Sequence, residues 1–271
     1  MTGADPSTWS TDAPSCPGLP EALLRSAAPR LRCLPRQRPP WRTVPSDHPT
    51  DPSEIAPDPA AWAERNASQA KAFDTIGERY DEAFPNKEGQ EDCVRRLLSL
   101  LPPGAQVLDL GSGTGLPTAR QLAGAGARVT GFEISERMLE LARRNVPEAE
   151  FRQADIVDLD PAEESYDAIV AFFSLLCLPK ERIPEALGRV RASLAPGGLM
   201  CLSMVEADLD DVPIPFLGAE VRVSGYPRDE LRSVVERAGL VIEDERVVGF
   251  RPEDEGARPE VQVFLTCRRG A

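Results

Sequence analysis

The amino-acid sequence predicts an α/β protein built on a doubly wound, mostly parallel sheet of seven strands. Between residues 106 and 268, short apolar segments alternate with longer segments of helical periodicity. Residues 166–173 are almost continuously apolar, which is typical of a strand buried on both faces. A glycine-rich turn, residues 111–115, directly follows the first apolar segment. These features predict a Rossmann-like sheet with helices on both faces and an antiparallel last strand.

Residues 1–57 are predicted to be a disordered or loosely ordered tail. Thirteen of the 27 prolines precede residue 60, and the six arginines of the tail nearly balance its acidic residues. The stretch 25–42, whose basic residues are all arginines, is interpreted as part of a solvated tail, with a targeting or docking element as the alternative. We therefore expect one folded domain over residues 58–271, with a helical lid over residues 58–101 at its start.

Two helices are expected before the first strand. The dipeptide Asp58-Pro59 is a typical helix start, with an N-cap residue followed by proline at the first helical position. A second helix is expected over about residues 88–101, and Pro102-Pro103-Gly104 ends it. On the first helix, the apolar residues of one face repeat at helical spacing: Phe73, Ile76, Tyr80 and Phe84.

Strands and helices then alternate to the end of the chain. Strands are expected at residues 106–110, 128–133, 150–153, 166–173, 199–205, 240–249 and 260–268. Helices are expected up to residue 124, from Ser135 to just before Pro147, and over residues 181–194 and 229–238. The segment 206–226 is expected to be irregular.

The net charge of −13 lies almost entirely on the folded domain, which argues against nucleic acid or an anionic membrane surface as a partner. The longest apolar run, residues 168–178, is shorter than the ~18 residues that a membrane span needs. Residues 1–20 lack the pattern of a secretory signal. A cytoplasmic protein is expected.

The cysteines and the single histidine limit the possible chemistry. The six cysteines form no CxxC pair, so we expect reduced, mostly buried thiols and no metal site. Cys177 is interpreted as a core residue rather than as a nucleophile. The only histidine, His48, lies in the tail, so catalysis that uses a histidine is not expected in the domain.

The clearest functional pattern is Val107-Leu108-Asp109-Leu110-Gly111-Ser112-Gly113-Thr114-Gly115. It lies where the first strand ends and a helix begins, and its glycines allow the backbone to approach a ligand closely. Glu133 follows Gly111 by 22 residues, at the end of the second strand, where a carboxylate can accept hydrogen bonds from both hydroxyls of a ribose. Asp155 occupies the equivalent position after the third strand.

Four linked motifs occur in order along the chain: Asp109 with Gly111-x-Gly113-x-Gly115, then Glu133, then Ala154-Asp155-Ile156, then Leu194-Ala195-Pro196-Gly197-Gly198. In this order they resemble the class I S-adenosylmethionine-dependent methyltransferases of the small-molecule type, over about residues 70–268. The resemblance implies S-adenosylmethionine as the cofactor and S-adenosylhomocysteine as the product.

The resemblance implies roles for the residues around the glycine-rich turn. This turn, including Ser112, is expected to pack under the adenosyl and methionyl parts, with Asp109 as a direct or water-mediated contact. Glu133 is expected to hold the ribose diol. For both Glu133 and Asp155, the alternative is a strand-end carboxylate that only caps the next helix.

The resemblance also implies a binding site for the adenine and the methyl group. Ile134 and Met138 are expected to flank the adenine. Asp155 is expected to bond the adenine amino group, with the backbone of Ile156 beside it. Phe172, Phe173 and Ser174, at the end of the fourth strand, lie where the family places residues around the transferred methyl.

Candidate catalytic residues come from two segments. Tyr80 lies on the N-terminal helix, which covers the cofactor in similar enzymes; the alternative is a core aromatic residue. The segment 206–226 is expected to form the acceptor pocket. Because the domain lacks histidine, any proton that the acceptor loses would have to pass to Tyr80, Glu206, Tyr226 or Asp208. The alternative is an acceptor that needs little help, such as a carboxylate, an amine or an acidic phenol.

The sequence therefore predicts an enzyme that moves a methyl group from S-adenosylmethionine to an oxygen or nitrogen atom of a small organic metabolite. Secondary metabolites belong to this acceptor class. One alternative is an NAD-dependent oxidoreductase, although Leu116 replaces the third glycine of the GxGxxG pattern. A second alternative is a non-catalytic protein that binds S-adenosylmethionine and acts through a partner.

Overall fold

The computed structural model describes residues 59–85, 87–162, 165–250 and 260–270. The chain divides into two units, residues 1–55 and 56–271, and every described residue belongs to the second. The expectations for the tail, for His48 and for the N-cap Asp58 therefore lie outside the described residues.

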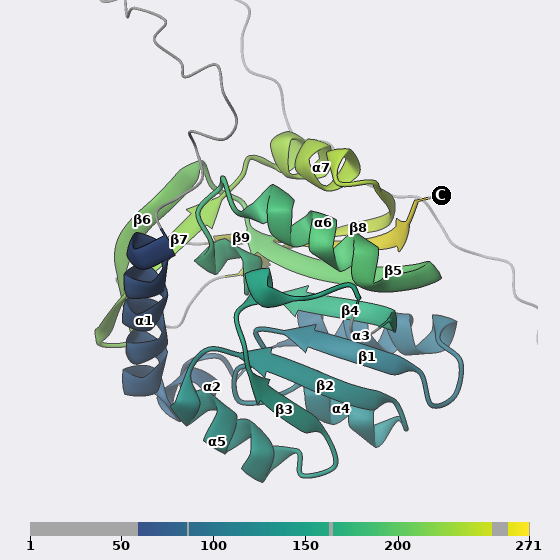
Figure 1. Cartoon of the computed structure of the whole chain (residues 1–271), viewed down its shortest axis with the longest axis horizontal. Helices are drawn as coiled ribbons and strands as arrows, with labels where there is room; N and C mark the ends of the chain where they lie inside the picture. The colour runs from purple at the N-terminus through teal and green to yellow at the C-terminus, as the bar shows by residue number, and fades with distance from the viewer. Residues whose placement is uncertain (1–58, 86, 163–164, 251–259, 271) are drawn as a thin grey trace, which may run out of the picture. The chain divides into compact units, whose positions relative to one another are not determined.

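Seven strands form one sheet in the order β3-β2-β1-β4-β5-β9-β8 (Figure 1). Neighbouring strands are parallel except that β9 runs antiparallel to both β5 and β8. This arrangement confirms the predicted doubly wound sheet with an antiparallel last strand. The strands are β1 (Gln106–Leu110), β2 (Arg128–Glu133), β3 (Glu150–Gln153), β4 (Tyr166–Phe172), β5 (Leu194–Val205), β8 (Leu240–Phe250) and β9 (Glu260–Arg269).

Helices cover both faces of the sheet because alternate residues of each buried strand point to opposite sides. Val107 of β1 belongs to one apolar cluster, whereas its neighbour Leu108 belongs to another. The cluster around Val107 contains residues of α3 (Glu88–Leu100), α4 (Thr118–Gly124) and α5 (Glu136–Asn145). The cluster around Leu108 contains residues of α6 (Ile183–Ser193) and α7 (Arg228–Arg237).

The expected single helix before residue 85 is divided into two helices. α1 (Pro59–Ile76) ends at Gly77, which has a φ of +49°, and α2 (Arg79–Ala83) follows it. A left-handed backbone conformation interrupts helical geometry, and glycine adopts it without steric cost. Tyr80 and Phe84 therefore do not continue the apolar face of α1.

The prediction of an irregular segment over residues 206–226 was wrong. Most of it forms a separate antiparallel sheet of two strands, β6 (Leu209–Phe216) and β7 (Ala219–Gly225). Pro213 and Pro215 obscured this hairpin because proline donates no hydrogen bond within a strand. A two-stranded sheet tolerates them because each of its strands is an edge strand.

The hairpin β6–β7 and α1 pack together (Figure 1). Ala72 and Ile76 of α1, Leu141 of α5 and Val221 of β7 share a third apolar cluster. Gln69 of α1 adds two hydrogen bonds with the backbone of Arg222, one of 3.0 Å and one of 3.2 Å. Apolar packing and backbone hydrogen bonds therefore join the first helix to a hairpin about 150 residues later in the sequence.

The expectation of reduced, mostly buried thiols is confirmed for the described cysteines. All four are free, and Cys93, Cys201 and Cys267 are buried while Cys177 is partly buried. In this part of the chain, no helix combines the length and the apolar character needed to cross a membrane.

Replacing Leu187 with alanine should destabilise the domain by about 2–5 kcal/mol because the leucine lies fully buried on α6 and a cavity would remain. Leu100→Ala is the matched control, since that leucine is 56% exposed and the change should cost less than about 0.5 kcal/mol. Urea unfolding with unchanged slope measures both values. Equal costs for the two variants would contradict the assignment of α6 to the core.

Candidate active site

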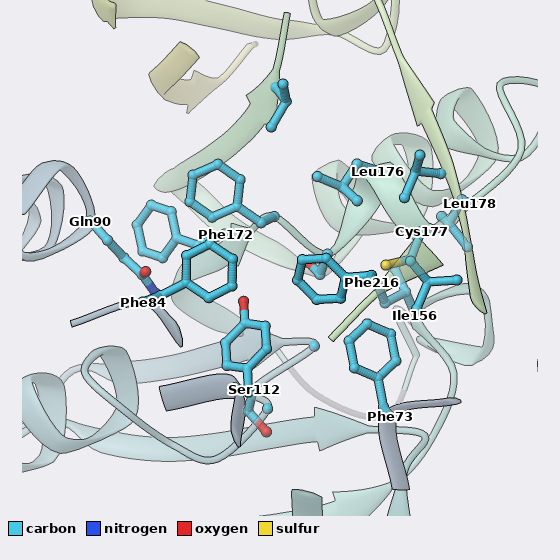
Figure 2. A pocket seen from close by; sticks show the side chains of 18 of the residues that line it. Phe73, Phe84, Gln90, Ser112, Ile156, Phe172, Leu176, Cys177, Leu178 and Phe216 are labelled. Carbon is cyan, nitrogen blue, oxygen red and sulfur yellow. The ribbon is translucent and has the colours of Figure 1, made fainter. Parts of the chain in front are cut away.

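A cavity of about 540 Å³ opens at the carboxyl ends of the parallel strands (Figure 2). Its wall combines the segments that follow β1, β2, β3 and β4 with residues of α1, α2, α3 and the hairpin β6–β7. Open α/β sheets bind their ligands at this edge, and cavities of ~300–1,000 Å³ are typical of small-molecule sites. The cavity is therefore the candidate active site.

The glycine-rich turn after β1 forms part of this wall. Gly111, Gly113 and Gly115 have φ values of +72°, +53° and +77°. A Cβ atom on Gly111 would lie 2.4 Å from the Cβ of Ser174, so only glycine fits there. Gly111, Ser112 and Gly113 line the cavity, whereas a Cβ on Gly115 would point at Val146 and Phe151 in the core. Residues 111–114 of the turn thus line the cavity, and residue 115 does not.

Glu133, at the end of β2, is buried and lines the cavity. Its carboxylate accepts hydrogen bonds of 2.9 Å from the backbone N–H of Gly113 and from that of Ser135. Burial raises its pKa, and these backbone hydrogen bonds partly oppose the rise. The N-cap of α5 is Ser135, whose hydroxyl accepts from Met138 N–H, so Glu133 is not itself the cap. Each carboxylate oxygen keeps a lone pair for a ligand hydroxyl.

Asp155 follows β3 and lines the cavity, and one of its carboxylate oxygens is hydrogen-bonded to the backbone. Its Oδ1 accepts a 3.2 Å hydrogen bond from Val157 N–H and caps the short 3₁₀ helix η2 (Ile156–Asp158). Its Oδ2 accepts a hydrogen bond from the Asn66 amide of α1. Burial raises the pKa of Asp155. The capping role is therefore present, while the second oxygen contacts Asn66, which also lines the cavity.

Asp109 is buried behind the glycine-rich turn and does not line the cavity. Its Oδ2 has no hydrogen-bond partner among the described residues. Burial, and then the charge of Glu133, raise the pKa of Asp109 to about 7. Three hydroxyls near the turn are also buried without a partner there: Ser112, Thr114 and Ser174. Unpaired buried polar atoms are costly, so these atoms fit a site in which bound polar ligands complete their hydrogen bonds.

The four apolar residues predicted to contact the cofactor all line the cavity: Ile134, Met138, Ile156 and Phe172. Figure 2 shows Ile156 beside Phe73 and near Leu178, while Phe172 lies toward Phe84 and Gln90. Nine of the eleven predicted cofactor residues thus share this cavity, and the exceptions are Asp109 and Gly115.

The three candidate catalytic residues are not brought together. Tyr80 lines the cavity, but burial raises its pKa, so its hydroxyl cannot accept a proton near neutral pH. Glu206 pairs with Arg228 at 2.6 Å, and this contact lowers the pKa of Glu206. Tyr226 is buried, donates to the carbonyl of Lys180 at 3.1 Å and has its pKa raised to about 12, chiefly by burial.

Glu206 and Tyr226 therefore maintain the fold outside the cavity, and the structure gives neither of them access to a ligand there. Asp208, the further candidate, forms an ion pair of 2.8 Å with Lys180 and also lies outside the cavity wall. The hairpin instead presents apolar side chains to the cavity, Ile214 and Phe216 among them. The interpretation of this segment as part of the acceptor pocket thus applies to its apolar residues.

Sequence reasoning missed several residues of the cavity. Asn66 carried no pattern, because its position depends on how α1 packs. Cys177, interpreted as a core residue, lines the cavity, and burial raises the pKa of its thiol to about 11, which disfavours a nucleophilic role. Within the described ranges, no three potential metal ligands form a cluster. Phe173, which is expected near the transferred methyl, also lines the wall, and so do three further aromatic residues: Phe84, Phe216 and Phe264.

A family model described as a methyltransferase domain matches residues 107–198. Methyltransferase GfsG of Streptomyces halstedii is 32% identical over 198 residues, which cover 67% of this chain and 70% of that protein. O-methyltransferase cnsE of Penicillium expansum is 32% identical over 173 residues and 60% of each chain. The ubiquinone biosynthesis O-methyltransferase of Methylocella silvestris is 31% identical, and this chain spans 65% of its length.

Solved structures agree with these relatives. The structure of DhpI in complex with S-adenosylhomocysteine is 25% identical, has a TM-score of 0.59 and covers 76% of this chain and 97% of that one. The 1,6-didemethyltoxoflavin N1-methyltransferase of Burkholderia thailandensis shares the fold, with a TM-score of 0.59, 21% identity and coverage of 80% and 92%. These matches decide against the NAD-dependent oxidoreductase. The chain belongs to the class I S-adenosylmethionine-dependent methyltransferases.

Proposed function

We propose that this protein transfers a methyl group from S-adenosylmethionine to an oxygen or nitrogen atom of a small organic metabolite. The acceptor class covers secondary as well as primary metabolites. The convergence of nine predicted cofactor residues on a single cavity that also has an aromatic wall carries the proposal. The oxygen acceptor has additional support from two relatives named as O-methyltransferases.

In this proposal the cofactor binds along the carboxyl ends of β1, β2 and β3. Glu133 holds the two ribose hydroxyls while its bond to Gly113 N–H keeps the glycine-rich turn in place. Asp155 accepts from the adenine amino group through Oδ2, the oxygen that Asn66 contacts. Ile134 and Met138 pack against the adenine, because both line this part of the wall. Each of these roles falls on a residue that lines the cavity.

The charge of the cofactor also suits the site. S-adenosylmethionine supplies an electrophilic methyl group on a positively charged sulfur. Asp109 places a buried carboxyl group directly behind the turn, where its negative form would attract a cation. The unpartnered hydroxyls of Ser112 and Thr114 offer further hydrogen bonds to the polar methionyl end.

The chain itself contributes positioning and the exclusion of water rather than a strong base. The cavity wall is largely apolar on the acceptor side, with Phe172 and Phe216 among its residues. Holding the acceptor atom within about 3 Å of the methyl group in a dry pocket accounts for much of the acceleration expected of such an enzyme. Tyr80 then acts as a wall residue, because its raised pKa keeps its hydroxyl protonated.

Calorimetric titration with S-adenosylmethionine, S-adenosylhomocysteine and NAD tests the cofactor. We expect micromolar affinity for the first two and none for NAD. Mass spectrometry should then detect S-adenosylhomocysteine formed with a panel of hydroxyl and amine acceptors. Cofactor binding without product from any acceptor would favour the remaining alternative, a non-catalytic protein that binds S-adenosylmethionine.

Glu133→Ala should weaken binding of S-adenosylmethionine by roughly 1.5–3 kcal/mol, because charge-assisted hydrogen bonds to the ribose are lost. Glu133→Gln, which keeps one acceptor oxygen, should lose less. The matched control is Glu236→Ala, an exposed glutamate on α7 that should leave the affinity unchanged. Circular dichroism checks that each variant is folded, and wild-type affinity in folded Glu133→Ala would overturn the ribose assignment.

The affinity for S-adenosylmethionine should rise by up to about tenfold between pH 6 and pH 8. Below about pH 7 Asp109 is protonated, so binding of a cation must displace its proton; above that pH the carboxylate is already charged. Asp109→Asn should remove this part of the pH dependence, and calorimetry at each pH measures it. Identical pH profiles for the two proteins would show that Asp109 does not contribute to the binding of the cation.

A further inference from the structure

Aromatic side chains are concentrated in the candidate active site. Seven of the nine phenylalanines in the sequence line the cavity, and Tyr80 joins them. Ordinary apolar packing would draw on the whole set of apolar residues, of which aromatic residues form a small part: they make up 6% of the sequence against 41% for all hydrophobic residues. The enrichment therefore calls for an explanation in terms of the ligand.

A first aromatic group covers the cavity from outside the main sheet. Tyr80 lies 5.4 Å from Phe84 and 6.5 Å from Phe216, measured between ring centroids, and the rings of Phe84 and Phe216 stack at 5.8 Å. These residues come from α2, the residue after it, and β6, so the helical segment and the hairpin contribute jointly. All three rings are partly exposed and face the cavity.

A second aromatic group belongs to the main sheet. Phe264 of β9 lies 6.3 Å from Phe172 and 5.7 Å from Phe173, with the latter pair edge to face. Phe173 has a φ of 54°, which is unusual for a bulky residue and marks a constrained position at the end of β4. On the other side, a Cβ on Gly89 of α3 would lie 2.7 Å from the Phe264 ring, so glycine is needed for this packing.

The two aromatic groups lie in the same half of the cavity. Figure 2 shows Phe84 close to Phe172, with Phe216 on the side toward Ile156. The part proposed for the adenine has the aliphatic side chains of Ile134, Met138 and Ile156 in its wall, and one ring, that of Phe73, lies beside Ile156. Aromatic rings favour other rings through stacked or edge-to-face contacts, beyond the area that they bury. The aromatic half therefore suits a planar ring better than an aliphatic chain.

One polar atom lies between the aromatic half and the cofactor turn. Ser174 directly follows Phe173, lines the cavity and is 7% exposed, and its hydroxyl has no partner among the described residues. Its Cβ lies 2.4 Å from where a Cβ of Gly111 would be, so the serine contacts the turn that is proposed to hold the methionyl end. A buried hydroxyl without a partner is costly unless a ligand completes its hydrogen bond.

We propose that the acceptor is a planar aromatic hydroxy compound whose ring lies between the two aromatic groups and whose hydroxyl bonds Ser174. This proposal rests on the proposed methyltransferase function and specifies its substrate class. It places the acceptor oxygen at the junction between the aromatic half and the cofactor turn. The acceptor reacts as its phenolate, after releasing its proton to solvent: its oxygen forms a bond to the methyl carbon, the bond from that carbon to the sulfonium sulfur breaks, and S-adenosylhomocysteine leaves.

Three probes of similar size test the proposal on the full chain saturated with S-adenosylhomocysteine: 2-naphthol, its saturated analogue decahydro-2-naphthol, and naphthalene. Calorimetry or naphthol fluorescence measures each affinity. We expect 2-naphthol to bind about five- to tenfold more tightly than decahydro-2-naphthol, because only the planar ring stacks. It should also bind several-fold more tightly than naphthalene, because naphthalene offers no partner to Ser174.

Variants separate the two contacts. Phe216→Leu should remove most of the preference for the planar ring, whereas Val212→Leu, on the same strand but outside the cavity wall, should retain it. Ser174→Ala should remove the advantage of 2-naphthol over naphthalene while leaving the affinity for S-adenosylhomocysteine unchanged. Phe216→Leu should also bind S-adenosylhomocysteine normally, which shows that it is folded.

Equal binding of the saturated and planar probes, or no binding of any probe to protein loaded with S-adenosylhomocysteine, would overturn the proposed acceptor class. A loss of S-adenosylhomocysteine affinity in Ser174→Ala would assign the serine to the cofactor and overturn its contact with the acceptor. Failure of wild-type protein to bind S-adenosylhomocysteine is a distinct result, because it would overturn the proposed function itself.

Discussion

The hydrogen bond from Gly113 N–H to the Glu133 carboxylate joins the two segments on which the candidate active site depends. It links the turn after β1 to the end of β2, and the second oxygen of Glu133 holds Ser135 N–H at the start of α5. Because β1 and β2 are parallel neighbours, their carboxyl ends meet at one edge of the sheet. A single buried carboxylate therefore fixes the spacing between the parts of the wall proposed for the methionyl end and for the ribose.

The cover of the cavity is connected to this frame through α1. Asp211 of the hairpin accepts from Arg65 of α1 at 2.5 Å and from Arg222 at 2.7 Å, while Asn66 contacts Asp155. The first helix thus contacts Asp155, which is proposed to bind the adenine amino group. It also contacts the hairpin that supplies Phe216. The cover and the cofactor site are consequently coupled, although α1 lies outside the part of the chain that matches the family model.

Local patterns in the sequence predicted the sheet and the cofactor side of the cavity, because both depend on residues that lie close together along the chain. The glycine-rich turn, Glu133 and Asp155 each follow one of three successive strands. These strands are neighbours in the sheet, so their ends lie side by side. The acceptor side depends on contacts between distant segments, such as that of Tyr80 with Phe216. Glu206 and Tyr226 were selected for their chemistry alone, and only the structure shows that Arg228 and Lys180 engage them. Alternating Ile214 and Phe216 could have revealed the hairpin, had the intervening proline not masked it.

The two halves of the cavity differ in how much they cost the stability of the protein when no ligand is bound. Asp109 and Glu133 are both buried carboxyl groups with raised pKa values, and the charge of one raises the pKa of the other. Without a cation this arrangement opposes ionisation and costs stability, so it benefits the protein only when a positive ligand is bound. The aromatic half carries no such cost, since rings pack against one another in the absence of ligand. Cofactor binding should therefore relieve the electrostatic cost in the first half, while acceptor binding draws on surfaces that are already formed.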